Sequence, residues 1–248
     1  MVPPARCRVP MSDRPAVTVA LPVFNGRALV AEAIDSVLGQ KGWDLHLVVV
    51  DDGSSDGSGD LLSERAAGDA RIEVIRLPTN CGVAHARNVA VAARQDPLVA
   101  FIDQDDRWRP DRLDVGWRAL SCAPELDYVL AHQVFERPTG DLPPWVRERW
   151  LEGPQQGHVF GTLLAWRDRA WNAVGPLDET LRFGLDDVDW FARAQDLGLR
   201  QAMLPDVLLE RGLHAGNASA RTREGNAELV AVLRAKLQRH DRGEEVAQ

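Results

Sequence analysis

Residues 48–60 read VVVDDGSSDGSGD, an apolar run that changes abruptly into acids, serines and glycines. One interpretation is a helix-loop-helix calcium site that begins at Asp52, but its last ligand would then be Ser63, where this motif needs a glutamate. The other interpretation is a buried strand whose carboxyl end presents polar side chains to a ligand, as in open α/β sheets. Because the calcium motif is incomplete, the flanking sequence has to decide between the two.

The neighbouring segments repeat the arrangement of an apolar strand followed by a polar loop. The apolar patterns predict strands at residues 17–21, 45–50, 72–77 and 98–102, and helices at 29–38, 60–67 and 83–94. Regular alternation of strands and helices predicts an α/β fold with a doubly wound parallel sheet and right-handed crossovers.

In such a sheet, the loops that follow the strands share one edge. The polar residues of these four loops are Asn25; Asp51 and Asp52; Asn80 and Arg87; and Asp103, Asp105 and Asp106. We therefore expect them to converge on one ligand site, which explains why the strand of residues 45–50 ends in carboxylates.

Composition bounds the possible functions. The chain has 248 residues, a formal charge of -8 and a pI near 5.3, so it can fill one large domain and lacks the basic balance of nucleic-acid binders. No apolar run approaches the ~20 residues of a membrane span. The three cysteines show no paired spacing, which favours reduced thiols. We expect a soluble cytoplasmic protein, and a peripheral position at the inner face of the membrane is compatible with the sequence.

Residues 101–106 read FIDQDD, a strand end followed by three acids. Asp103 and Asp105 supply the hard oxygen ligands with which Mg²⁺ or Mn²⁺ is held on a nucleotide. Taken alone, the acids could equally form a solvated turn that caps the next helix. Their place on the same edge as Asp52 favours the metal site. His214 is a further candidate ligand, although a lone loop histidine is usually only a polar residue.

Two other stretches carry candidate chemistry. Asn80 precedes a helix that holds Arg87 one turn inside, an arrangement suited to a diphosphate; the alternative for Arg87 is a surface ion pair. Asp186 and Asp187 belong to a second acidic cluster, where a carboxylate could act as general base towards an acceptor hydroxyl. The same acids could cap a helix, and both roles are compatible.

In their order along the chain, these motifs resemble those of the family 2 glycosyltransferases. The matching segments are PVFN at 22–25, DDGSSD at 51–56, residues 80–88, 103–110 and 186–193. The resemblance covers about residues 16–220 and implies the GT-A fold, a single α/β domain with a Rossmann-like, mostly parallel sheet flanked by helices and a C-terminal acceptor-side region. It also implies a metal-dependent, inverting transfer of a sugar from a nucleoside-diphosphate sugar to an acceptor hydroxyl.

The resemblance further implies roles for individual residues. Pro22 and Asn25 would flank the nucleotide, Asp52 would read the base, Asp103 and Asp105 would bind ribose and metal, and Asp187 would be the base. Asn80 and Arg87 would contact the donor, and His214 would bind metal or diphosphate. Two positions depart from the family pattern. Asp186 replaces a usual glutamate, which leaves the choice of base between Asp186 and Asp187 open, and Gly212 occupies a usual arginine position, with Arg211 one residue earlier.

The sequence predicts a disordered segment at 1–15, a nucleotide-sugar-binding half at 16–112, an acceptor and catalytic-base half at 113–223, and a C-terminal helix and tail at 224–248. Residues 137–157, rich in proline and glycine, predict a lid that contains Trp145 and Trp150. The acceptor, a glycan, a lipid-linked sugar or a small molecule, is left open, as are the sugar and the nucleotide base. The main alternative is a noncatalytic nucleotide-sugar-binding or interaction subunit, which would not need Asp105 and Asp187. A nucleotidyltransferase would need a glycine-rich, lysine-bearing loop that the sequence lacks.

Overall fold

The computed structural model describes residues 13–136, 142, 146–181, 185–214, 230 and 232. Its first half contains every strand and helix that the sequence predicts there, with ends shifted by a few residues. The elements are β1 (Val17–Val23), α1 (Val30–Leu38), β2 (Leu45–Asp51), α2 (Ser58–Gly68), β3 (Ile72–Arg76), α3 (Val83–Ala92) and β4 (Leu98–Phe101).

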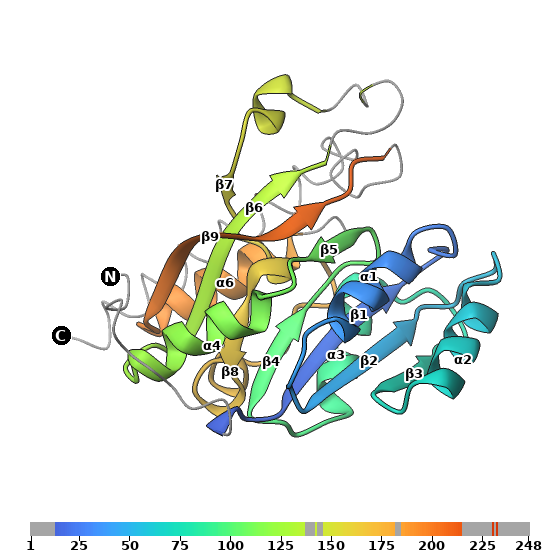
Figure 1. Cartoon of the computed structure of the whole chain (residues 1–248), viewed down its shortest axis with the longest axis horizontal. Helices are drawn as coiled ribbons and strands as arrows, with labels where there is room; N and C mark the ends of the chain where they lie inside the picture. The colour runs from blue at the N-terminus through green and yellow to red at the C-terminus, as the bar shows by residue number, and fades with distance from the viewer. Residues whose placement is uncertain are drawn as a thin grey trace.

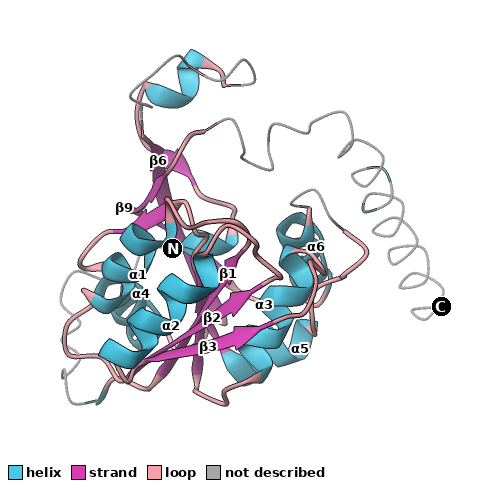
Figure 2. Ribbon diagram, turned by 90° about the vertical axis from the view of Figure 1, so that its right-hand side faces the viewer, coloured by secondary structure: helices cyan, strands magenta, loops and turns pink. Residues whose placement is uncertain are grey.

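These strands form the parallel part of the sheet, in the order β3-β2-β1-β4. The side chains of β2 alternate between two apolar layers, because Leu47 and Val49 pack with α1 and α2, whereas Val48 and Val50 pack with α3. Figure 2 shows the two helical layers on opposite faces of the sheet. The doubly wound arrangement predicted from the sequence is therefore confirmed.

Strand β1 continues through Pro22, although the sequence predicted that it would stop there. The pairing of β1 with β4 ends at Ala20 and Phe101, with one further bond from the Ile102 N–H to the Ala20 carbonyl. Pro22 lies beyond this ladder, so its missing N–H removes no bond from the sheet. The strand can therefore extend to Val23 and present its last residues at the edge.

The second half adds to the same sheet. Its elements are β5 (Asp106–Trp108), α4 (Arg112–Cys122), β6 (Tyr128–Phe135), η2 (Glu148–Leu151), β7 (Gln155–Gln156), η3 (Phe160–Thr162), β8 (Leu164–Trp166), η4 (Arg167–Trp171), α5 (Asn172–Val174), α6 (Asp186–Asp196) and β9 (Gln201–Arg211). The sheet continues from β4 as β8-β6-β9-β5, in which β8 is antiparallel to both neighbours and β5 to β9. The long pair β6 and β9 is visible in Figure 1. One sheet thus runs through both predicted halves.

Helix α6 is fixed by an aromatic cluster on the α3 face of the sheet. Trp190 is fully buried and packs against Trp171, Tyr128 and Phe160, with ring centroids 5.6–5.9 Å apart. Phe101 at the end of β4 contacts Phe160 in turn, at 4.7 Å. This packing sets the position of the acidic first turn of α6 relative to the end of β4.

The opposite edge of the sheet is held by a polar network. Arg167 is buried and donates to the carbonyls of Asp96 and Val91 and to the Thr18 hydroxyl, at 2.6–3.1 Å. The Asp96 carboxylate accepts from Thr18 and lies 2.9 Å from His46 Nδ1. The network ties the amino ends of β1, β2 and β4 to η4, far from the predicted ligand edge.

Several predictions about the amino-terminal segment, the cysteines, the lid and the C-terminal helix need correction or are left open. Arg14, predicted to be disordered, stacks over Trp43 at 5.0 Å and pairs with Asp114 at 2.7 Å, so it belongs to the fold. Cys122 is disulfide-bonded, so the prediction of three reduced thiols is wrong. Part of the predicted lid, residues 137–141 and 143–145 with Trp145, and the C-terminal helix apart from residues 230 and 232 lie outside the described residues. Within the described chain, no helix is both long and apolar enough to cross a bilayer.

Candidate active site

The loops that follow β1 and β2 are joined by hydrogen bonds, as the sequence predicts for a shared edge. Asn25, at a left-handed φ of 48°, donates its N–H to Ser54 Oγ and accepts from the Ser55 N–H, both at 2.9 Å. The Phe24 N–H donates to Gln104 Oε1 at 2.9 Å, which brings in the loop after β4. Three strand ends, including Pro22 at the end of β1, thus form one surface.

Asp56 supports this surface from the turn that precedes α2. One of its oxygens accepts from the Ser58 N–H at 2.9 Å and the other from the Arg27 N–H at 3.0 Å, so Asp56 links α2 to the β1 loop. Burial opposes ionisation, but the hydrogen bonds from Ser58 and Arg27 prevail and lower the pKa of Asp56. These bonds occupy the oxygens that a calcium ion would use, which supports the strand-end interpretation of residues 48–60.

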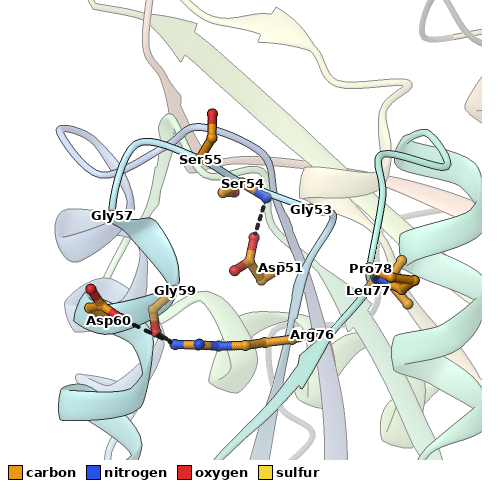
Figure 3. A pocket seen from close by; sticks show the side chains of 10 residues that line it. All are labelled: Asp51, Gly53, Ser54, Ser55, Gly57, Gly59, Asp60, Arg76, Leu77 and Pro78. Carbon is orange, nitrogen blue, oxygen red and sulfur yellow. Dashed lines mark hydrogen bonds and ion pairs between the residues drawn. The ribbon is translucent and has the colours of Figure 1, made fainter.

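A pocket of about 390 Å³ opens at the ends of β2 and β3. It is lined by Asp51, Gly53, Ser54, Ser55, Gly57, Gly59, Asp60, Arg76, Leu77 and Pro78. Figure 3 shows the Asp51 carboxylate pointing into it, with one oxygen 3.0 Å from the Ser54 N–H. The pocket lies on the α2 side of the sheet, because Gly59 and Asp60 of α2 line it together with Asp51.

Asp52 points to the α3 side, where it holds the loop after β3. It is buried, and its two oxygens accept from the Cys81 N–H at 2.7 Å and the Gly82 N–H at 2.9 Å. These are the first backbone donors before α3, where a carboxylate is stabilised by the helix dipole. Asn80, one residue earlier, is exposed at the same edge. The structure thus places both predicted donor residues together and gives Asp52 a structural task as well.

Arg87 lies within α3 and is only 5% exposed. Its Nη1 donates to Asp186 Oδ2 at 2.6 Å, its Nη2 contacts Asp103 Oδ1, and its guanidinium carbon lies 5.2 Å from the centre of the Phe160 ring. The two acids raise the pKa of Arg87 against the effect of burial. The sequence left two roles open for Arg87, a surface ion pair or a diphosphate ligand. In the structure the guanidinium is buried and bonded to two acids, so it is not a surface ion pair.

The acids after β4 meet the end of β9. Asp105 Oδ2 lies 2.9 Å from His214 Nε2, so the structure joins the two predicted metal ligands. Asp106 is buried, accepts from the Gly212 N–H at 3.3 Å and lies 3.6 Å from Arg211 Nε. Burial raises the pKa of Asp106 well above its usual value, although Arg211 opposes this.

The departure at Gly212 has a steric cause. A Cβ built on this residue would lie 2.2 Å from the Asp105 carbonyl oxygen, so no side chain fits there without movement of the backbone. Arg211 instead lies close enough to Asp103, Asp105, Asp106 and Asp187 for all four charges to raise its pKa, against the effect of burial. The sequence shows that Arg211 stands one residue before the usual arginine position, and the structure places its charge among these acids.

Asp186 and Asp187 open α6 but differ in accessibility. Asp186 is fully buried against Arg87, and its Oδ1 has no hydrogen-bond partner. Asp187 is partly accessible. Burial and the charge of Asp186 raise the pKa of Asp187 to about 7, against the opposing effects of Arg87, the Val188 N–H and Arg211. A partly accessible carboxyl group with this pKa suits proton transfer near neutral pH.

The donor set suits a divalent ion that also binds its substrate. Asp105 supplies a carboxylate and His214 an imidazole nitrogen, and this mixture of oxygen and nitrogen ligands fits Mn²⁺ better than Ca²⁺. Among the described residues, no three His, Cys, Asp or Glu side chains gather into a complete metal cage. Asp105 and His214 would therefore leave most coordination positions to diphosphate oxygens and water.

Comparison with known proteins gives a consistent result. The family model described as glycosyl transferase family 2 matches residues 18–164. The succinoglycan biosynthesis protein ExoO of Rhizobium meliloti is 38% identical over 223 residues, which are 84% of this chain and 62% of ExoO. An uncharacterised glycosyltransferase of Haemophilus influenzae is 32% identical over 102 residues, 41% of each chain. The chain thus spans less than two thirds of the length of either relative.

Solved structures share the fold at low sequence identity. The mannosyltransferase PcManGT of Pyrobaculum calidifontis, in complex with GDP-Man and Mn²⁺, has a TM-score of 0.66 at 22% identity, covering 90% of this chain and 64% of its own. TarS of S. aureus (residues 1–349), in complex with UDP-GlcNAc, also has a TM-score of 0.66, at 20% identity, covering 83% of this chain and 61% of its own. The sheet and its flanking helices are thus of the same type in all three proteins.

Proposed function

The chain belongs to glycosyltransferase family 2 and has its GT-A fold, and from this premise we propose that it transfers a sugar from a nucleoside-diphosphate sugar to a hydroxyl group of a polysaccharide precursor. The polysaccharide is suggested by relatives such as ExoO, named for succinoglycan biosynthesis. The observation that carries the proposal is the position of Asp187, a partly accessible carboxyl group that directly follows Asp186, which Arg87 joins to Asp103 at the end of β4.

We assign donor binding to the strand ends. Pro22 and Asn25 form one wall, while Asp52 and Asn80 form the other wall on the α3 side. Asp103, at the end of β4, would bind the ribose. The structural neighbours bind different nucleotides, GDP-Man in PcManGT and UDP-GlcNAc in TarS, so the shared fold does not by itself select the base.

Asp187 would take the proton of the acceptor hydroxyl as its oxygen attacks the anomeric carbon. The bond from the anomeric carbon to the diphosphate breaks on the opposite side, which inverts the configuration. A divalent ion, held by Asp105 and His214, would stabilise the negative charge of the departing diphosphate. Arg211 lies among the same carboxylates and adds a permanent positive charge at this edge.

A donor panel tests this proposal. The purified protein is incubated with UDP-, GDP-, CDP- and dTDP-sugars, with and without Mn²⁺, and nucleotide release is measured with and without oligosaccharide acceptors. We expect release from one nucleotide class, dependent on the metal and stimulated by the acceptor. Nucleotide binding without turnover for every acceptor, and no difference between wild type and Asp187→Asn, would instead favour a noncatalytic binding subunit.

A further inference from the structure

One guanidinium joins three separate segments of the candidate active site. Arg87 comes from α3, Asp103 follows β4, and Asp186 is the first residue of α6. Nη1 of Arg87 bonds Asp186 at 2.6 Å and Nη2 contacts Asp103. The two acids lie far apart in sequence, and no other described side chain is seen to bond both.

This geometry differs from that of a free phosphate ligand. Arg87 and Asp186 are 5% and 0% exposed, and the guanidinium rests on the Phe160 ring. Each terminal nitrogen keeps a second N–H, but the side chain is buried, so a diphosphate could reach the guanidinium only if one of the acids moved away. Displacing Asp186 would leave a carboxylate in the interior without a cation, which is strongly unfavourable because its Oδ1 already lacks a partner.

We propose that Arg87 is a positioning residue that fixes the base-bearing first turn of α6 against the donor-binding end of β4. The inference rests on the proposed function for its catalytic consequence. Asp187 directly follows Asp186, so a shift of the Arg87 contact moves the base relative to a sugar held at Asp103. Displacement of a catalytic group by ~1 Å can lower a rate by ~10²-fold.

The planar fork is essential to this role. A guanidinium offers two terminal nitrogens in fixed geometry and can bond one acid with each, whereas a lysine ammonium is a single compact charge. Arg87→Lys therefore keeps the charge but cannot hold both acids in the same arrangement. Arg169→Lys is the matched control, since its two terminal nitrogens donate to the Pro124 carbonyl at 2.9 Å and to the Asp127 carboxylate at 2.8 Å, and neither partner belongs to α6.

The experiment compares kcat at saturating donor with nucleoside-diphosphate affinity measured by calorimetry. For Arg87→Lys we expect kcat to fall at least ~10-fold while the nucleotide Kd changes less than ~3-fold. Arg169→Lys should change neither by more than ~2-fold. A loss of nucleotide affinity as large as the loss of kcat would show that Arg87 is a diphosphate ligand and overturn the proposal, as would an unchanged kcat.

A second measurement does not depend on turnover. In Arg87→Lys, hydrogen exchange of the backbone amides of Asp189, Trp190 and Phe191 should accelerate, because the first turn of α6 has lost its anchor. The control should leave these amides unchanged. If the wild type proves inactive with every donor, the proposed function fails, but this exchange result still decides whether Arg87 positions α6. Unchanged exchange in Arg87→Lys would overturn the proposal.

Discussion

Asp187 differs from its neighbour in what it can reach. Asp186 is fully buried and bonded to Arg87, so an acceptor hydroxyl cannot approach it, whereas Asp187 is partly accessible. Asp187→Asn keeps the shape but removes the proton acceptor. We expect kcat to fall at least ~10²-fold, with donor affinity close to wild type, as measured by nucleotide release and calorimetry.

Asp186→Asn is the matched variant for this experiment. An asparagine can still accept a hydrogen bond from Arg87, so we expect a milder loss of kcat. A greater loss in Asp186→Asn than in Asp187→Asn would move the base to Asp186. If both variants kept full activity, direct displacement with a carboxylate base would be the wrong mechanism.

The protonation of Asp187 should appear in the pH profile. Its pKa is raised to about 7, so the ionised form needed for catalysis is lost as the pH falls through this value. We expect kcat to decrease by about tenfold per pH unit on the acid side. Removing the like charge in Asp186→Asn lowers the pKa of Asp187, so the acid limb should move to lower pH. A limb that stays in place would show that another group titrates.

The sequence predicted which residues belong to the candidate site better than it predicted the contacts between them. The acids at 103, 105 and 187 were found by their place after strands and at a helix start, and the structure gathers them around Arg211. The contact between Arg87 and Asp186 could not be predicted, because it joins residues 99 positions apart. The role of Arg211 was left open by the sequence, because the steric demand at Gly212 becomes visible only when Asp105 lies against it.

At the scale of elements, Asp56 joins α2 to the β1 loop. Asp56→Ala removes the acceptor of the Ser58 and Arg27 N–H groups, and because these are hydrogen bonds to a charged group we expect the free energy of unfolding to fall by ~1–2 kcal/mol. The donor site should weaken with it. Asp60→Ala is the control, because the Asp60 side chain is exposed and its ion pair with Arg76 is long at 3.8 Å. We expect this variant to lower the free energy of unfolding by less than ~0.5 kcal/mol. Urea titration measures the loss of stability in both variants, and equal losses would contradict the role of Asp56 as a link between α2 and the β1 loop.

The junction of β5 and β9 depends on Gly212. Gly212→Ala forces the Asp105 backbone away and should cost ~1–3 kcal/mol, while it separates Asp105 from His214. We expect weaker metal-dependent nucleotide binding in calorimetry. Gly68→Ala is the control, since a Cβ there meets nothing within 4 Å. Metal-dependent affinity equal to wild type in Gly212→Ala would mean that the Asp105–His214 contact is not used.

At the scale of the whole molecule, the two edges of the sheet have separate tasks. Arg167 holds the amino ends of the strands, and no described contact joins it to the acids of the other edge. Arg167→Met leaves buried acceptors unpaired, and we expect a loss of ~3 kcal/mol of stability with kcat per folded molecule unchanged. Thermal unfolding and the nucleotide-release assay measure the two effects. A large fall in kcat at full folding would mean that the edges are coupled.

The global fold was predictable for its first half and only in outline for its second. From β1 to β4, strand and helix periods alternate in short segments with polar loops between them, and local pattern suffices. Beyond Arg112, β8 enters the sheet antiparallel between β4 and β6, and β5 pairs with β9 about a hundred residues later. Such pairings are set by tertiary packing, which a local hydrophobic period does not encode.

The three-way contact of Arg87 also has a consequence for biosynthesis. A ribosome releases the chain from its amino end, and domains fold as units while it emerges. Arg87 and Asp103 are therefore made well before Asp186, and until then the fork holds one acid only. A nascent chain that ends before α6 therefore lacks the residue that completes this contact. Since one sheet runs through both halves, the contact can form only when the whole domain folds, so that no unfinished chain carries an assembled base.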